Sequence, residues 1–204
     1  MSDHPASMAS RSGDDVADLG YVPAPDLFQL PQGMNFGPCS GVAVNSKGHI
    51  FVFHRAEHSL LEFDAKGGYI RTHGRGLYTR PHGLRIDADD NIWTTDVGAH
   101  IVVKMDAGGR IRLVLGVKDL AADWHQARHL RAFNEPNDVA FGRSGTVYVS
   151  QGHGKGESRL LMFDANGDFI KSWGGEGTAP GQFWMPNGIA INRQNEIFVT
   201  DSYN

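Results

Sequence analysis

The feature that most constrains the fold is a unit of about fifty residues that recurs along the chain. Each copy opens with a short apolar run, turns at a Gly- or Asn-containing dipeptide, and continues with a second apolar run. The four openings are Ser40-Gly-Val-Ala-Val, His82-Gly-Leu-Arg-Ile, Asn137-Asp-Val-Ala-Phe and Asn187-Gly-Ile-Ala-Ile. A repeat of this length indicates a stacked architecture in which each unit buries its faces against its neighbours.

Each complete copy contains four apolar segments, which in the first copy cover approximately 41–45, 49–53, 59–63 and 68–72. Alternating apolar residues joined by Gly-containing turns are typical of antiparallel hairpins. The 26 glycines among 204 residues exceed the usual share of ~7 % and fall mainly in these turns. The sequence therefore predicts an all-β chain, a β-propeller of four-stranded antiparallel blades with about three and a half blades present.

The repeat boundaries also predict the domain organisation. We expect residues 1–24 to be a disordered tail and 25–204 to be an incomplete propeller. The blades are expected at approximately 37–76, 80–116, 135–177 and 185–204. Because the fourth copy stops after its second strand, we expect the N-terminal part of a longer ring with an exposed apolar face. The alternative is a closed four-bladed ring in which Leu27–Phe36 supplies an outer strand.

The composition restricts which classes of partner and which cellular compartment are expected. A formal net charge of −4 provides no basic stripe, so nucleic acid is excluded as an expected partner. No apolar stretch approaches the ~20 residues of a membrane span, and the N-terminus lacks a signal peptide's apolar region. The single cysteine, Cys39, cannot form an internal disulfide, and we expect a buried, inert thiol. A cytoplasmic protein is the default prediction.

The last repeat and its predecessor resemble the NHL repeat. The resemblance is carried by Pro186-Asn-Gly-Ile-Ala-Ile, by Ile197-Phe-Val-Thr-Asp-Ser-Tyr-Asn204 and by Phe163-Asp-Ala-Asn-Gly-Asp-Phe-Ile-Lys-Ser-Trp-Gly174. It covers about 37–204 and implies a propeller, most often six-bladed. It implies no activity, because the fold hosts scaffolds and enzymes alike.

A narrower resemblance is to the peptidyl-α-hydroxyglycine α-amidating lyase family. It is carried by Ile50-Phe-Val-Phe-His-Arg-Ala-Glu-His58, Arg80-Pro-His-Gly-Leu-Arg-Ile-Asp87, Trp93-Thr-Thr-Asp-Val-Gly-Ala-His100 and Glu135-Pro-Asn-Asp-Val-Ala-Phe141. The resemblance implies cleavage of a hydroxyglycine-extended peptide into an amidated peptide and glyoxylate. It also implies a zinc held by three histidines, a catalytic arginine and tyrosine, and a structural calcium elsewhere in the full ring.

Carried over by residue, this resemblance places the arginine at Arg55 and the first zinc histidine at His82. His153 takes the place of the tyrosine, and Asn187 stands where the second histidine is implied. The third histidine and the calcium ligand fall beyond the repeats present. The resemblance therefore supports the fold of the family more strongly than its reaction. We expect this fragment by itself to be inactive.

The residues also suggest chemistry without the resemblance. The positions that open each inner strand and the loops that leave each second strand are expected at one mouth of the channel, where Arg55, His82 and His153 would meet. A neutral imidazole at His82 suits zinc or another divalent transition metal, with His54, His58, His100 and His153 as candidate neighbours; alternatively His82 packs between blades. Arg55 is expected to hold a carboxylate, or only to pair with Glu57, Asp96 or the last carbonyls of a strand.

His153 lies in the glycine-rich loop Gly152-His-Gly-Lys-Gly156. A histidine there is either a general base or a solvated loop residue. Asp64, Asp106 and Asp164 recur after third strands and are expected to cap turns, whereas Asp96 and Asp201 are expected to brace loops. The stretch Asp119–Arg131 is the one place where a short helix competes, as a lid over the channel or a surface insertion.

Three functions remain open from the sequence. The first is a metal-dependent carbon–nitrogen lyase acting on a small carboxylated or peptide-terminal substrate, with catalytic residues Arg55 and His153 and metal ligand His82. The second is a non-catalytic NHL propeller that binds a ligand or a protein partner through its loop face. The third is a calcium-dependent lactonase-like propeller, for which the repeats offer no cluster of acidic channel residues.

Overall fold

The protein was examined as a computed structural model that describes residues 20–122, 124, 131–154 and 157–202. Within these ranges the secondary structure consists of fourteen β-strands, and no helix is present. None of the described residues therefore forms a helix that could cross a membrane. The predicted all-β class is confirmed.

The strands form four antiparallel sheets, each following chain order. The first contains β1 (Cys39–Val44), β2 (Ile50–His54), β3 (Leu60–Phe63) and β4 (Tyr69–His73). The second contains β5 (Pro81–Ile86), β6 (Ile92–Asp96), β7 (Ile101–Met105) and β8 (Ile111–Leu115). The third contains β9 (Pro136–Phe141), β10 (Val147–Gln151), β11 (Arg159–Phe163) and β12 (Phe169–Gly174). The fourth contains β13 (Pro186–Ile191) and β14 (Ile197–Asp201).

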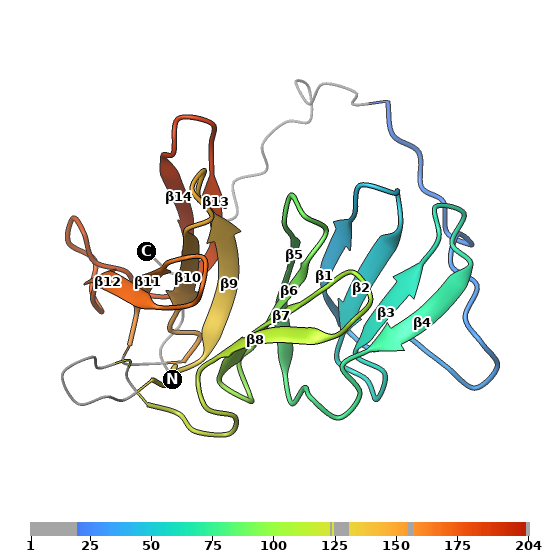
Figure 1. Ribbon diagram of the computed structural model, residues 1–204, viewed down its shortest axis with the longest axis horizontal. Coiled ribbons are helices and arrows are strands. Elements are labelled where there is room, and N and C mark those ends of the chain that lie inside the picture. The colour runs from blue at the N-terminus through green and yellow to red at the C-terminus, as the bar shows by residue number, and fades with distance from the viewer. Residues whose placement is uncertain (1–19, 123, 125–130, 155–156, 203–204) are drawn as a thin grey trace, which may run out of the picture.

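The four sheets are arranged like blades around a common axis. Strands β1, β5, β9 and β13 are the innermost strands, and each contacts the next across the blade boundary. Figure 1 shows these strands side by side through the middle of the molecule, with β4 and β12 toward its two sides and β8 crossing the middle of the view. The described part of the chain thus forms three four-stranded blades and one two-stranded sheet of a β-propeller.

Alternation along each strand sends successive side chains to opposite neighbours, because side chains in a strand point to alternate faces. Phe51 and Phe53 of β2 pack toward the second blade, where they meet Leu84. Val52, between them in sequence, packs on the opposite face of the same sheet, next to Phe63. Each fully buried aromatic or aliphatic side chain contributes about 1.5–3 kcal/mol to the stability of the fold. The apolar layers between the blades therefore hold the blades together.

The turns after the third strands are capped by aspartate, as the repeats predict. In the first blade one Oδ1 of Asp64 accepts hydrogen bonds from the amides of Lys66 and Gly68. Asp106 and Asp164 make the same pair of bonds in the next two blades. These carboxylates replace the backbone partners that a tight turn leaves unpaired, which explains the recurrence without a functional role.

The N-terminal segment covers the first blade, which corrects the alternative that Leu27–Phe36 completes the fourth sheet. Gln29 forms a parallel bridge with Gly68 beside the first blade. Phe28 and Phe36 pack against the buried ring of Phe63 in the same blade. The segment packs on the first blade because its apolar residues cover an apolar face of that sheet that would otherwise contact water.

Two other sequence expectations fall mainly on residues outside the described ranges. The predicted tail, 1–24, is described only from Gly20 onward, where the residues are exposed. The predicted helix or insertion, Asp119–Arg131, is described only at its two ends and at Trp124. Trp124 is 6 % exposed and packs on Phe163 of the third blade, so this position belongs to the core rather than to a surface insertion.

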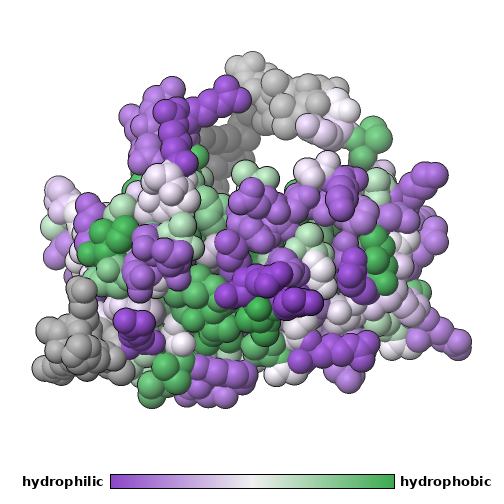
Figure 2. All heavy atoms as spheres, viewed as in Figure 1, coloured by the Kyte–Doolittle hydropathy of each residue, from purple (hydrophilic) through white to green (hydrophobic). Residues whose placement is uncertain are grey.

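Apolar side chains remain exposed on the innermost and outermost strands. Val42 of β1 and Phe198 of β14 are 63 % and 57 % exposed. Ile111 and Val114 of β8 are also exposed, and Figure 2 shows apolar surface in the part of the view that β8 crosses in Figure 1.

A buried charge network stabilises the first blade. Glu62 on β3 is 2 % exposed, and its carboxylate contacts His49, His73 and Arg71, each at 2.8 Å. Burial opposes ionisation of Glu62, but the hydrogen bonds from His73 and His49 and the charge of Arg71 outweigh it. Together these contacts lower the pKa of Glu62 to about 2. Since the folded pKa lies below the unfolded one, this carboxylate stabilises the fold above about pH 4.5.

Replacing this carboxylate should remove both the network and its pH dependence. We expect Glu62→Gln to lower the free energy of unfolding at pH 7 by about 3 kcal/mol, because a buried carboxylate that contacts His73, His49 and Arg71 is lost. In the native protein the contribution of Glu62 should fall as the pH decreases from about 4.5 toward about 2, and in the variant that loss should be absent. Urea unfolding across this pH range measures both effects.

The matched control is Glu176→Gln, at an exposed glutamate, which should change stability by less than about 0.5 kcal/mol. Equal stability changes for the two variants would contradict the assignment of Glu62 as a stabilising buried charge.

Candidate functional site

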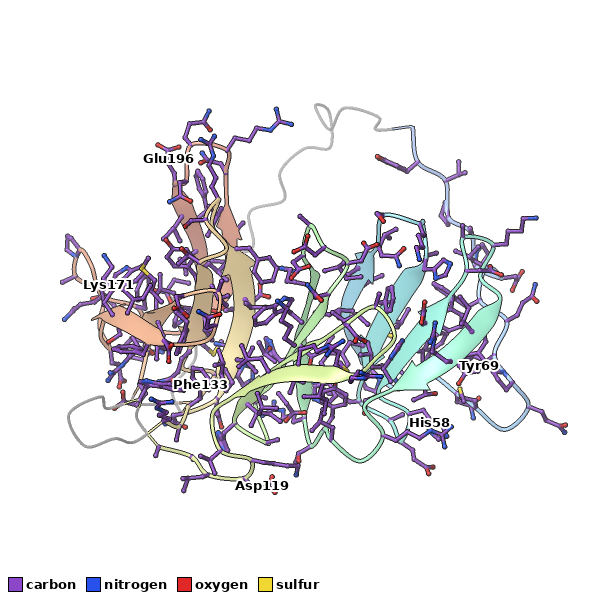
Figure 3. All side chains as sticks on the ribbon, in the orientation of Figure 1. His58, Tyr69, Asp119, Phe133, Lys171 and Glu196 are labelled. Atoms are coloured by element: carbon purple, nitrogen blue, oxygen red, sulfur yellow. The ribbon has the colours of Figure 1, made fainter. Side chains whose placement is uncertain are left out.

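The two ends of the channel carry different loops. The tight turns of the β1–β2, β5–β6, β9–β10 and β13–β14 hairpins lie at one end, marked by Glu196 at the top of Figure 3. The loops that leave the second strands lie at the other end, marked by His58 near the lower edge of Figure 3. The candidate residues Arg55, His82 and His153 belong to the second end, because they follow or open strands on that side.

The last residue of the second strand in each sheet fixes the loop that leads into the same sheet. Its side chain accepts hydrogen bonds from backbone amides at 2.7–3.1 Å. The four acceptors are His54, Asp96, Gln151 and Asp201, and their donors are Gly37, Thr79 and Arg80, Asn134, and Trp184 and Met185. This bracing positions the first residues of β1, β5, β9 and β13.

The predicted bracing roles of Asp96 and Asp201 are confirmed, whereas those of His54 and Gln151 were missed. The signal was available, since all four residues occupy the same position in the aligned repeats. The shared role is hard to recognise in the sequence because the residue types differ. A carboxylate, an amide oxygen and an imidazole nitrogen can each accept a hydrogen bond from the same backbone N–H.

Asn137 connects three blades at the channel mouth. Its backbone carbonyl oxygen accepts hydrogen bonds from Nδ1 of His82 at 2.8 Å and from the hydroxyl of Thr95 at 2.6 Å. Its side-chain Oδ1 lies 3.1 Å from Nδ1 of His153, and its Nδ2 donates to the carbonyl oxygen of Pro186 at 2.8 Å. The residue is fully buried, so these contacts are shielded from water.

His82 and His153 lie against each other. Their ring centroids are 4.8 Å apart, with an edge-to-face angle of 68°. Burial lowers the pKa of His82 to about 4; the hydrogen bond to Asn137 opposes this, and nearby positive charges reinforce it. Burial and the charges of Arg80 and Arg55 also lower the pKa of His153. Both imidazoles are therefore neutral at pH 7 and can offer a nitrogen lone pair.

Arg55 follows β2 directly and is exposed. Its Nε atom donates a hydrogen bond to the carbonyl oxygen of Pro81, the first residue of β5, at 3.1 Å. The sequence predicts a pairing with the last carbonyls of a strand, whereas the observed acceptor is the first residue of one. The carboxylate of Asp96, by contrast, is occupied by backbone amides.

The charge of Arg55 acts on both histidines, lowering the pKa of His82 and of His153. The structure therefore brings the three predicted site residues together at one end of the channel. A pocket of about 350 Å³ opens between the first two blades, with Arg55 and Pro81 in its wall; neither histidine lines it. An arginine next to a pocket and two neutral imidazoles can hold a small carboxylate and exchange a proton with it.

The other histidines considered as neighbours of His82 lie elsewhere in the fold. His54 is fully buried against Phe36 in the first blade, and Nδ1 of His100 accepts a hydrogen bond from the amide of Glu135. Asn187, at the position implied for a second zinc histidine, accepts a hydrogen bond from Ser150 through its carbonyl oxygen. Among the described residues, no group of three His, Cys, Asp or Glu side chains could hold a metal ion.

The expectation that Cys39 is a buried thiol is wrong. Cys39 opens β1 and is exposed. No other sheet of the described residues covers this end of β1, and the side chain that the strand pattern assigned to the core is exposed there.

Comparison with known proteins shows what the chain is similar to. The NHL repeat family matches residues 183–204. A probable peptidyl-alpha-hydroxyglycine alpha-amidating lyase of Caenorhabditis elegans is 31 % identical over 82 % of this chain and 54 % of that protein. The chain is a β-propeller that carries one matched NHL repeat, and it is similar to α-amidating lyases.

Further matches support the same resemblance and define its extent. The peptidyl-glycine alpha-amidating monooxygenase of Mus musculus is 32 % identical over 88 % of this chain, which spans only 20 % of that protein. A solved streptogramin B lyase aligns with a TM-score of 0.61 at 16 % identity, over 84 % of this chain and 51 % of that one. The second likeness shows the fold alone. The chain thus spans between a fifth and about half of these relatives.

The bracing carboxylate of the second blade provides a test of how the site is positioned. We expect Asp96→Asn to lower the free energy of unfolding by about 2 kcal/mol, because an amide nitrogen would face backbone N–H groups that now donate to the carboxylate. The His82 imidazole resonances should shift as well, since the braced loop leads directly to that residue. Chemical denaturation and NMR measure the two effects.

Asp89→Asn, in the exposed turn at the other end of the second blade, is the control and should leave both quantities unchanged within error. An Asp96→Asn protein with native stability and native His82 resonances would show that the loop is held by other contacts.

Proposed function

We propose that the propeller containing this chain is a peptidyl-α-hydroxyglycine α-amidating lyase, a carbon–nitrogen lyase acting on peptides that end in α-hydroxyglycine. The observation that carries the proposal is the convergence of Arg55, His82 and His153 at one end of the channel. The similarity to proteins named for this reaction supports the substrate class.

Arg55 is the group that binds the carboxylate of the substrate terminus. Among the described residues its side chain bonds only to Pro81, through Nε, so the two terminal nitrogens of the guanidinium can form the paired hydrogen bonds that a carboxylate accepts. The charge of Arg80 adds to the positive potential around the two histidines. Bound at Arg55, the terminal residue would place its hydroxyl next to His82 and His153.

His82 fits a metal ligand in one respect that the structure tests. Its Nδ1 is bonded to a backbone carbonyl, the arrangement that orients metal-binding histidines and leaves Nε2 for the metal. A zinc or similar divalent ion bound there would supply Lewis acidity to the substrate hydroxyl. Since the described residues hold no three-ligand cluster, we expect the 204-residue chain alone to bind the peptide without cleaving it.

His153 is the proton acceptor in this proposal. Its Nε2 takes the proton from the hydroxyl of the terminal residue, and the electron pair of that O–H bond forms the new carbonyl of glyoxylate. The bond between the α-carbon and the peptide nitrogen then breaks, and its electron pair stays on nitrogen. Protonation of that nitrogen gives the terminal amide. A neutral histidine with a lowered pKa suits this role at pH 7.

Turnover by the whole protein tests the proposal. A peptide ending in α-hydroxyglycine should be converted into the amidated peptide and glyoxylate, detected by mass spectrometry. Arg55→Ala should lower kcat/KM by roughly 100-fold through loss of the paired hydrogen bonds to the carboxylate. Arg193→Ala, in the exposed β13–β14 turn at the other end of the channel, should retain full activity.

The competing function is a propeller that binds a ligand or protein without catalysis. It would be favoured if the metal-loaded whole protein failed to cleave the peptide, or if Arg55→Ala and Arg193→Ala had equal activity. Metal analysis of the whole protein is a second criterion, because the lyase reading requires a bound transition metal.

A further inference from the structure

Asn137 makes more contacts at this site than any of the three residues that sequence reasoning selected. It is the second residue of β9, is 0 % exposed, and touches the first residues of the neighbouring inner strands on both sides. We propose that Asn137 is a positioning residue that holds His82 and His153 in the Nδ1–H tautomer, leaving two adjacent Nε2 atoms unprotonated toward one ligand.

The tautomer of His82 follows from the chemistry of its partner. Its Nδ1 lies 2.8 Å from the backbone carbonyl oxygen of Asn137. A carbonyl oxygen can only accept a hydrogen bond, so Nδ1 must carry the proton. In a neutral imidazole the other nitrogen, Nε2, then has a free lone pair.

The tautomer of His153 follows from a chain of two bonds. The carbonyl oxygen of Pro186 can only accept, so the side-chain atom of Asn137 at 2.8 Å from it is the amide nitrogen. The opposite side-chain atom is therefore the amide oxygen, which lies 3.1 Å from Nδ1 of His153. An amide oxygen also only accepts, so this Nδ1 carries the proton and Nε2 is unprotonated.

The two free nitrogens belong to rings that lie against each other. The rings of His82 and His153 are in edge-to-face contact at 4.8 Å, and neither Nε2 has a hydrogen bond among the residues that the structure describes. A lone pair binds a transition metal or accepts a hydroxyl proton, whereas an N–H does neither. The use made of the two nitrogens rests on the proposed function; the tautomers do not.

The equivalent residue of the next blade does not orient an imidazole. Asn187 occupies the same position in β13, yet its side-chain nitrogen contacts the hydroxyl of Ser202 at 3.5 Å. What distinguishes Asn137 is its place between a histidine of the preceding blade and a histidine of its own blade. Among the residues that the structure describes, two imidazoles oriented by one asparagine occur only at the junction of the second and third blades.

Nitrogen NMR of the 204-residue chain labelled with ¹⁵N-histidine tests the inference at pH 7 without a substrate or a metal. The nitrogen shifts distinguish the protonated nitrogen of each ring, and His82→Gln and His153→Gln assign the signals. We expect Nδ1–H for both residues. His54 is the internal control: its Nδ1 accepts from the amide of Gly37, so it should show the opposite tautomer, Nε2–H.

Two variants separate the two bonds to Asn137. In Asn137→Ala, His153 should lose its preference for Nδ1–H, whereas His82 should keep it because its partner is the main chain. In Asn137→Asp the acceptor oxygen remains, so His153 should keep the Nδ1–H form. Circular dichroism checks that both variants are folded. If Asn137→Ala does not fold, the histidine tautomers of the wild-type protein and of Asn137→Asp still test the inference.

Either histidine showing Nε2–H in the wild-type protein would overturn the inference, as would an unchanged His153 tautomer in folded Asn137→Ala. For the whole protein we expect Asn137→Ala to lower kcat by roughly 100-fold, the usual contribution of a positioned base, and Asn137→Asp to restore most of the loss. Correct tautomers without turnover would reject the proposed lyase and retain the role of Asn137. Turnover by a protein whose two histidines are in the Nε2–H form would retain the proposed lyase and reject the role of Asn137.

Discussion

The structure depends on the burial of the apolar faces of the sheets against neighbouring sheets and, in the first blade, against the N-terminal segment. A four-stranded blade has two apolar faces and cannot cover either alone, so the side chains of β2, β6 and β10 alternate between one neighbour and the other. Phe53 and Leu84 join the first two blades, and Trp93 and Val149 join the next two. This packing fixes the inner strands relative to one another, which fixes the channel.

The site follows from that packing and from the bracing side chains. Burial sets the spacing of β5 and β9, and the acceptors at the ends of the second strands hold the loops that lead into them. His82, at the start of β5, and His153, just after β10, can then share Asn137 as a common partner. The same burial keeps both imidazoles neutral, because a charged ring would lose hydration there.

The fold could be read from the sequence because its signals are local. Two-residue alternation, Gly-containing turns and aspartate caps repeat in each copy, and the structure has all three. What could not be read was which partner a residue would find across a blade boundary. The placement of Leu27–Phe36 on the first blade and the contact between His82 and His153 depend on tertiary packing. Cys39 was misjudged because a strand pattern does not show whether a neighbouring sheet covers it.

The central claim is that Arg55, His82 and His153 act on one bound carboxylated molecule. The most direct measurement is a crystal structure of the protein with a small 2-hydroxy acid such as lactate. The account predicts the carboxylate on the guanidinium of Arg55, with the hydroxyl within hydrogen-bonding distance of Nε2 of His153. A carboxylate bound elsewhere, or an Arg55 side chain directed away from the two histidines in the complex, would contradict it.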